Sequence, residues 1–379
     1  MIVAAVRVRN FRNHRDSRLE FGDGINALLG DNGEGKTNIL EAISYLSLTR
    51  SFYAHADATV VRIGEGRFEV EGSIVSGGGI EHHVQIAYQG EEGTKEYAIN
   101  GSRPERLSSV IGRFPVVILS PENGAITFGG PAERRRFIDI LLSQISPAYL
   151  ETLFEYREVV RQRNKLLLDA RMRGIRPGDL LEPWDEGIAM HGSELVYRRQ
   201  RFVKEFSQYV IRSYGDLVEG GGEVPEIKYE SACVTEDAGA SREAIAENIR
   251  SVMQRYRSEE AKRGVTLVGP HRDNLLFTLS GIPVQRYASQ GQHKTLLVAL
   301  KIAEFTYLWE QREERPILLL DDVFSELDAR RSARILHMAG SLGQTIITTT
   351  DVRSFGSAVI WNEANRRFIV EQGTCRREA

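Results

Sequence analysis

The sequence has little cysteine, little net charge and no long apolar run. Its two cysteines, Cys233 and Cys375, form neither a CxxC pair nor a disulfide framework, so we expect a reducing compartment. No apolar run approaches the roughly 18 residues of a membrane span. The N-terminal apolar stretch is cut by Arg7 and Arg9 before it could serve as a signal peptide. We therefore expect a cytoplasmic protein without a membrane partner.

The small net charge limits how the chain could bind nucleic acid. The 379 residues include 52 acidic residues and 49 Lys plus Arg, for a formal net charge of −3. This balance excludes a uniformly basic coat, so any DNA contact must use a local basic patch. The length predicts about two or three domains.

The hydrophobic pattern alternates between strand and helix signals at both ends of the chain. Residues 25–48 read as strand, glycine loop and helix, and residues 59–100 read as an antiparallel meander. Residues 133–214 have apolar residues at helical spacing, and strands and helices alternate again after residue 292. The pattern predicts an α/β protein with a largely parallel sheet and a mainly helical second lobe.

A phosphate-loop motif, G-x-x-x-x-G-K-[ST], lies between the predicted strand and helix. The backbone N–H groups of such a loop converge on phosphate oxygens at a helix N-terminus. Lys36 is expected to reach the β- and γ-phosphates, and the Thr37 hydroxyl to bind Mg²⁺. We predict ATP and Mg²⁺ as ligands. The motif consists of Gly30, Asp31, Asn32, Gly33, Glu34, Gly35, Lys36 and Thr37.

A buried strand that ends in two carboxylates completes the pattern of a nucleotide hydrolase. Residues 317–320 are apolar and are followed by Asp321 and Asp322. Asp321 is the predicted metal ligand, and Asp322 is the predicted catalytic residue that orients or activates the attacking water. The alternative is a strand that enters a loop with two solvated carboxylates.

Three further segments resemble motifs of ABC-type ATPases. Ser289, Gly291 and Gln292 precede or open a predicted helix, which presents an anion site. Residues 325–328 resemble the D-loop, and residues 348–351 resemble the switch region. In ABC-type ATPases the signature serine and glycine of one protomer close over the nucleotide of another. The resemblance therefore implies two half-sites in each chain and an ATP-dependent homodimer.

The spacing of these motifs, together with several local strings, resembles the RecF family of bacterial recombination and repair ATPases. Thr37 and Gly291 are further apart than in a transporter subunit and too close for the long coiled coil of SMC proteins. The strings are residues 10–13, 120–122, 130–137 and 269–273. For His271, Arg272 and Asp273 we expect a role in ordering a loop, in preference to a catalytic role.

The resemblance implies an ABC-type head from residues 1–125 and 265–379, with a helical lobe at 126–264 inserted between its halves. It further implies a weak, DNA-stimulated ATPase in which ATP acts mainly as a dimerisation switch. RecF-like proteins bind duplex DNA at single-strand gaps and at junctions of single and double strands. They act with RecO and RecR to help RecA loading and SOS induction.

Two basic stretches of the helical region are candidate DNA contacts. Residues recurring every four positions share one helix face, which can follow a row of phosphates. The alternative is a solvated face on which arginine stems pack. The candidates are Arg157, Arg161, Arg163, Lys165, Arg198 and Arg199.

Two other classes of protein remain open at this point. An ATP-binding subunit of an ABC transporter shares the phosphate loop, but the motif spacing and Thr350 at the switch position, where transporters have histidine, argue against it. An ABC-headed nuclease of the overcoming-lysogenisation type would need an added acidic module after the head.

Overall fold

The chain divides into two compact units. The computed structural model describes residues 1–378 except 55, 176–177, 219–221, 235–240, 327–328 and 357. The first unit comprises Met1–Gly124, Asp216–Glu219 and Leu297–Ala379, and the second comprises Ala125–Gly215 and Gly220–Leu296. Among the described residues, no helix combines the length and apolar character needed to cross a membrane.

A six-stranded sheet forms the centre of the first unit. Its order is β14-β13-β3-β12-β11-β7, and all neighbours pair in parallel except β13 and β14. Every residue of β3, β7, β11 and β12 is buried, which explains the continuous apolar runs of β7 and of residues 317–320 in β11. The strands are β3 (Ile25–Leu29), β7 (Val116–Leu119), β11 (Ile317–Asp321), β12 (Thr345–Thr349), β13 (Arg366–Glu371) and β14 (Thr374–Glu378).

The predicted meander forms part of a second, antiparallel sheet in the same unit. Its order is β2-β1-β4-β5-β6, and the burial along β4 alternates as its sequence does. The antiparallel part of the fold prediction is thus confirmed. The strands are β1 (Ile2–Phe11), β2 (His14–Glu20), β4 (Arg67–Val75), β5 (Glu81–Gln89) and β6 (Thr94–Ile99).

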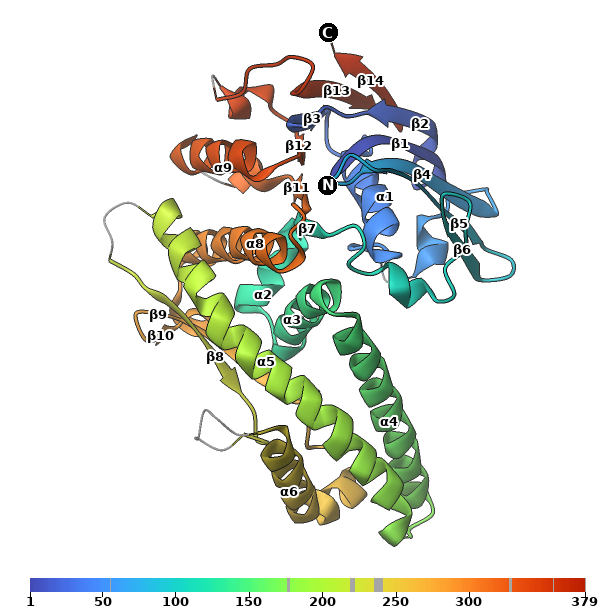
Figure 1. Ribbon diagram of the computed structural model, residues 1–379, viewed down its shortest axis with the longest axis vertical. Helices are drawn as coiled ribbons and strands as arrows, with labels where there is room; N and C mark the ends of the chain where they lie inside the picture. The colour runs from blue at the N-terminus through green and yellow to red at the C-terminus, as the bar shows by residue number, and fades with distance from the viewer. Residues whose placement is uncertain are drawn as a thin grey trace. The chain divides into compact units, whose positions relative to one another are not determined.

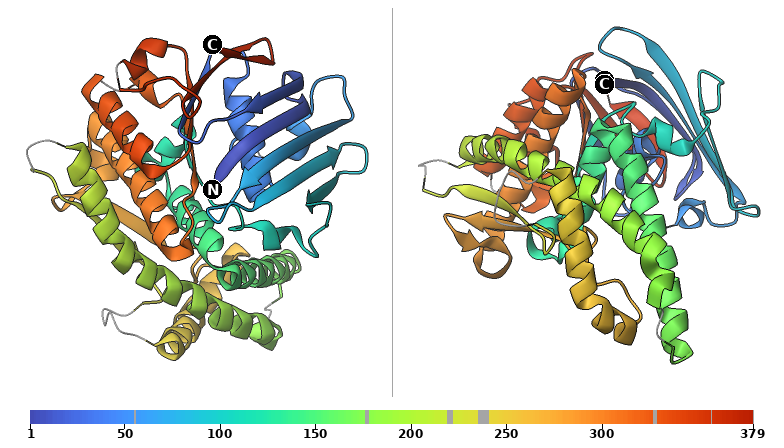
Figure 2. Two further views of the ribbon diagram at one scale, coloured as in Figure 1. Left: turned by 45° about the horizontal axis from the view of Figure 1, so that its top comes forward. Right: turned by 60° about the horizontal axis from the view of Figure 1, so that its bottom comes forward.

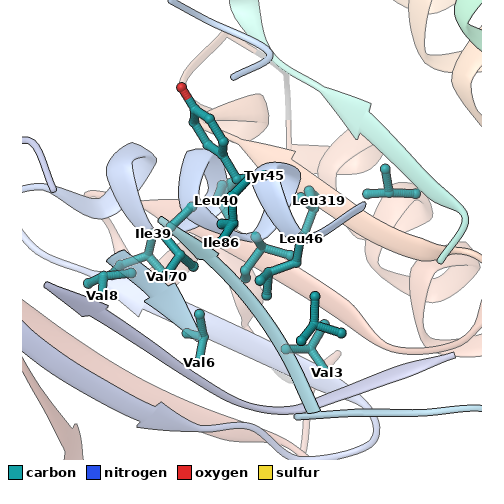
Figure 3. Packing of buried hydrophobic residues seen from close by; sticks show 14 of the residues in the cluster. Val3, Val6, Val8, Ile39, Leu40, Tyr45, Leu46, Val70, Ile86 and Leu319 are labelled. Carbon is teal, nitrogen blue, oxygen red and sulfur yellow. The ribbon is translucent and has the colours of Figure 1, made fainter. Parts of the chain in front are cut away.

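Helix α1 (Lys36–Leu48) lies between these two sheets (Figure 1). Its Ile39, Leu40 and Leu46 are fully buried, as are Val6 of β1 and Leu319 of β11. Figure 3 shows these side chains packed in one cluster. Because α1 packs against both sheets, the end of the loop that leads into α1 is fixed in position. The other helical segments of this unit are α9 (Ala329–Leu342), η1 (Asp57–Val60), η2 (Leu107–Val110), η3 (Pro121–Gly124), η5 (Val323–Glu326) and η6 (Val352–Phe355).

The second unit is mainly helical. Its long helices α4 and α5 meet near one end, with α6 beside them (Figures 1 and 2). Ser146 begins α4 by accepting a hydrogen bond from the N–H of Tyr149, and Pro147 occupies the first turn. Its helical segments are α2 (Ala125–Phe128), α3 (Pro131–Ile145), α4 (Pro147–Met172), η4 (Gly178–Leu181), α5 (Glu182–Leu217), α6 (Arg242–Arg263), α7 (Val284–Tyr287) and the start of α8 (Gln290–Arg312).

A small antiparallel sheet completes the second unit. Strand β8 (Pro225–Glu230) pairs with β9 (Asn274–Leu279), which pairs with β10 (Ile282–Pro283). Residues 265–296, which contain β9 and β10, thus fall in the second unit. The family resemblance assigned them to the head. The difference arises because β8 and β9 are separated by more than forty residues, so nothing local in the sequence shows that they pair.

Candidate nucleotide-binding site

The phosphate loop follows β3 and leads into α1, as the motif requires. Two of its glycines are needed because other atoms approach closely. A Cβ on Gly35, which has φ of 110°, would lie 2.5 Å from the side-chain oxygen of Asn13. A Cβ on Gly30 would lie 2.3 Å from the carbonyl oxygen of Val370. A side chain at either position would displace the loop.

Lys36 folds back over the loop. Its Nζ donates hydrogen bonds of 2.8 Å to the carbonyl oxygens of Gly30 and Asp31. Burial lowers the pKa of Lys36, while the charges of Asp322 and Asp321 oppose that shift. The ammonium group is therefore held by the loop carbonyl oxygens, which an incoming phosphate can replace.

The Thr37 hydroxyl and the Asp321 carboxylate are brought together. Thr37 Oγ1 donates to Asp321 Oδ1 at 2.7 Å, and Thr348 Oγ1 of β12 donates to the same oxygen at 2.7 Å. Asp321 is only 5% exposed, and burial raises its pKa. A buried carboxylate beside a hydroxyl is an oxygen donor set that suits a hard divalent cation.

Asp322 lies at the bend that follows β11. Its φ is 47°, and its backbone N–H donates to Thr348 Oγ1 at 2.9 Å. The turn separates the two aspartates, so that Asp321 is buried and Asp322 is partly exposed. The two carboxylates are thereby available for different roles.

The carbonyl oxygens of Glu34 and Gly35, in the phosphate loop, are bonded by residues outside the sequence motif. Asn13 Nδ2 and the N–H of Gly373 both donate to the carbonyl oxygen of Glu34, at 2.9 and 3.0 Å. The Nε2 of His14 lies 3.0 Å from the carbonyl oxygen of Gly35. Since Gly373 lies far along the chain, no sequence pattern could have linked it to the loop.

The signature segment forms an N-terminal capping box on α8. The Ser289 hydroxyl oxygen accepts from the N–H of Gln292 at 3.2 Å, and Gln292 Oε1 accepts from the N–H of Ser289 at 2.7 Å. Gly291 lies between them in the first helical turn. This geometry leaves the first N–H groups of a long helix oriented for an anion.

The remaining two motif segments are only partly described. Residues 327–328 of the predicted D-loop lie outside the described residues, and residues 323–326 form η5. At the switch segment, Asp351 caps η6 by accepting from the N–H of Arg353 at 2.8 Å. Neither observation assigns a nucleotide contact.

Two of the predicted DNA contacts are wrong. Arg163 is fully buried and bonds Asp185 and Glu260, each at 2.7 Å. Arg199 is 2% exposed and bonds Asp139 at 2.7 Å and the carbonyl oxygen of Pro270 at 2.8 Å. Both guanidinium groups hold the interior of the second unit together, and neither is accessible to a phosphate.

The other basic candidates remain accessible to different degrees. The Arg161 side chain is 70% exposed and pairs with Glu158 on its own helix, and Lys165 is exposed. Arg157 is 56% exposed and contacts Asp139, while Arg198 bonds Glu194 and Ser146. Arg161 and Lys165 are four positions apart on α4, so they share one face.

The contacts of the Gly-Pro-His-Arg-Asp string are those of a structural loop. His271 Nδ1 lies 2.6 Å from the Tyr156 hydroxyl, and Arg272 donates to the carbonyl oxygen of Thr266 at 2.8 Å. Asp273 accepts a hydrogen bond from Tyr229. Burial lowers the pKa of His271 to about 4, so the ring is neutral near pH 7.

A glycine loop between a parallel strand and a helix, bonded to a carboxylate at the end of a second parallel strand, defines a P-loop nucleotide-binding protein with an ABC-type head. The family model described as RecF/RecN/SMC N terminal domain matches residues 2–375. The DNA replication and repair protein RecF of Salinibacter ruber is 41% identical over 371 residues, which is 97% of this chain and 89% of that protein. The RecF of Chloroherpeton thalassium is 40% identical over 92% of this chain and 94% of its own length.

Solved structures give the same result. The recombination mediator protein RecF-ATPrS in the RecFOR pathway has a TM-score of 0.90 and 31% identity, covering 100% of this chain and 98% of its own. An Smc head bound to the C-winged helix domain of ScpA has a TM-score of 0.56 at 14% identity, which shows a shared fold alone. This chain belongs to the RecF family. The transporter alternative is not supported.

Proposed function

We propose that this chain is a DNA replication and repair protein that uses ATP to switch between a free protomer and a dimer on duplex DNA. The contact between Thr37 and Asp321, at 2.7 Å, carries this proposal because it joins the phosphate loop to the strand-end carboxylate. Membership of the RecF family supports the biological role, and the relatives of known structure include RecF-ATP.

ATP would bind at residues 30–37, with Lys36 exchanging its two carbonyl contacts for phosphate oxygens. Thr37 and Asp321 are suited to hold Mg²⁺, which would offset the charge of the phosphates. Asp322 is then the residue that orients or activates the attacking water, because it follows directly on the buried Asp321. Slow turnover suits a switch, since the bound state must outlast the search for DNA.

The second half-site is the capping box of Ser289 and Gln292. In the proposed dimer, the signature segment of one protomer covers the phosphates held by the loop of the other. The capping box supports this arrangement because it orders the first turn of α8 for an anion. Each closed dimer would then contain two nucleotides.

The proposed DNA surface is the exposed basic face of α4 that includes Arg161 and Lys165. Phosphate contacts of this kind recognise duplex shape and charge without reading bases. Gapped duplexes and junctions of single and double strands are the substrates that the family resemblance implies. RecO- and RecR-like mediators are the partners that it implies.

A gel shift with a gapped duplex tests the proposal. ATP should strengthen binding by the wild-type chain, whereas the Lys36→Ala variant should bind equally with and without ATP. A wild-type chain whose affinity for the duplex does not respond to ATP would contradict the switch. A second reaction with ADP separates nucleotide occupancy from the presence of a γ-phosphate.

A further inference from the structure

The signature residue Gln292 belongs to a chain of hydrogen bonds within the second unit. Gln292 Nε2 donates to Glu223 Oε1 at 2.6 Å. The Tyr214 hydroxyl, near the end of α5, donates to Glu223 Oε2 at 2.6 Å. Tyr214 is only 1% exposed. The Glu223 carboxylate thus links a buried tyrosine to the first turn of α8.

The N–H of Ser289 and the carboxylate of Glu223 both favour the same orientation of the Gln292 side-chain amide. The N–H of Ser289 needs an acceptor, so it fixes the position of Oε1. The Glu223 carboxylate can only accept, so it fixes the position of Nε2. Without Glu223, the side-chain amide of Gln292 could flip. The flipped amide would present its NH2 group to the N–H of Ser289, and the hydrogen bond that closes the capping box would be lost.

The small sheet explains why Glu223 lies beside the signature segment. Val224, next in the chain, pairs with Ser280 through an N–H···O bond of 2.8 Å donated by Ser280. Pro225 lies opposite Leu279 in the ladder of β8 and β9. After Leu279 the chain continues through β10 and α7 to Ser289, so the pairing of β8 with β9 brings Glu223 near the signature segment. Figure 1 shows β8, β9 and β10 side by side.

We propose that Glu223, supported by Tyr214, is a positioning residue for the signature half-site. It fixes the amide of Gln292, which closes the capping box and leaves the hydroxyl proton of Ser289 free to be donated to a γ-phosphate of the partner copy. The proposal rests on the ATP-dependent dimer of the proposed function. It assigns a role to a residue outside the motifs, at the entry to β8.

This role predicts a specific division of effects. The phosphate loop lies in the first unit and has its own bonds, so loss of Glu223 should leave ATP binding by the protomer unchanged within about twofold. The ATP-dependent association of two copies should weaken about tenfold in Glu223→Ala, the size expected for one hydrogen bond to a charged group. Glu223→Gln keeps an acceptor oxygen and should stay within about threefold of wild type.

Sedimentation of each variant with ATP measures the association, and titration with a fluorescent ATP analogue measures binding to the protomer. Glu226→Ala is the matched control, because Glu226 lies on β8, three residues after Glu223, and contacts Thr278 and Lys228 instead. Circular dichroism confirms that the alanine variants are folded.

Mixing two defective variants separates a signature defect from general damage. Lys36→Ala lacks a working phosphate loop, and Glu223→Ala has a weakened signature segment. A mixed dimer contains one composite site with both halves intact, so adding Glu223→Ala should bring Lys36→Ala protomers into ATP-dependent dimers that Lys36→Ala does not form alone.

The outcomes are distinct. Association of Glu223→Ala equal to wild type, or failure of Glu223→Ala to bring Lys36→Ala protomers into dimers, overturns the role of Glu223. Loss of ATP binding in folded Glu223→Ala also overturns it, because the effect would then not be confined to the signature half-site. A wild-type chain that stays monomeric in ATP overturns the proposed function itself.

Discussion

At the scale of the residue, the consecutive aspartates at the end of β11 have different surroundings. Asp321 is buried against two hydroxyl groups, whereas Asp322 turns away at a positive φ of 47°. The sequence predicted both carboxylates from the strand that precedes them. It could not show that Thr348, on a neighbouring strand, bonds to both aspartates. The Thr348 hydroxyl donates to the Asp321 carboxylate and accepts from the backbone N–H of Asp322.

Replacement of Asp322 tests the proposed division of roles. Asp322→Asn should retain ATP binding, because the loop and Asp321 are unchanged, and should slow hydrolysis at least about a hundredfold, as expected for loss of a catalytic base. Phosphate release under single-turnover conditions measures this step. Asp16→Asn, at an exposed aspartate that pairs with Arg7, is the control. Wild-type turnover in Asp322→Asn would show that another residue activates the water.

His271 makes the stability of the second unit depend on pH. Burial lowers its pKa to about 4, whereas an unfolded histidine has a pKa of about 6.5. Between these values the unfolded chain binds the extra proton, so stability falls as pH falls from about 6.5 to about 4. At pH 5 the loss should be about 2 kcal/mol relative to neutral pH.

Urea unfolding of wild type and of His271→Gln at pH 7 and pH 5 measures this loss. The glutamine variant lacks the titrating ring, so it should lose about 2 kcal/mol less between the two pH values. Equal pH dependence in both chains would contradict a neutral buried ring.

At the scale of the element, the helices of the second unit show where sequence periodicity is informative and where it is not. The spacing correctly predicted that residues 157–165 lie on one long helix. Periodicity did not show that Arg163 is enclosed between Asp185 and Glu260, because α5 and α6 are distant in sequence. A basic residue can serve as a phosphate contact or as a buried ion pair, and only the packing of other helices decides between them.

The exposed face of α4 gives a test of DNA binding with a matched control. Arg161→Glu combined with Lys165→Glu should weaken duplex binding at least about tenfold and flatten its salt dependence, since about two phosphate contacts would be lost. Arg18→Glu combined with Arg103→Glu is the control, because it changes the net charge equally and these side chains are 68% and 70% exposed and pair with glutamates. Equal losses in the two variants would indicate a nonspecific charge effect and would exclude the α4 face as the DNA surface.

At the scale of the whole molecule, the order of motifs along the chain anticipated the α/β head and the helical insert. The motifs are local strings, and the phosphate loop, the strand that ends in Asp321 and the helix that follows Ser289 all form as predicted. What local strings could not reveal are the contacts that cross long stretches of chain, such as Gly373 on the phosphate loop and the pairing of β8 with β9. The first of these places the C-terminal hairpin against the loop, and the second places Glu223 beside Gln292.

If ATP joins two copies of the chain, the mass of the protein in solution depends on nucleotide. Light scattering should give a mass near 42.6 kDa without nucleotide and twice that value with ATP. The Lys36→Ala variant should remain at the lower mass under both conditions. A wild-type mass that is the same with and without ATP would contradict the account.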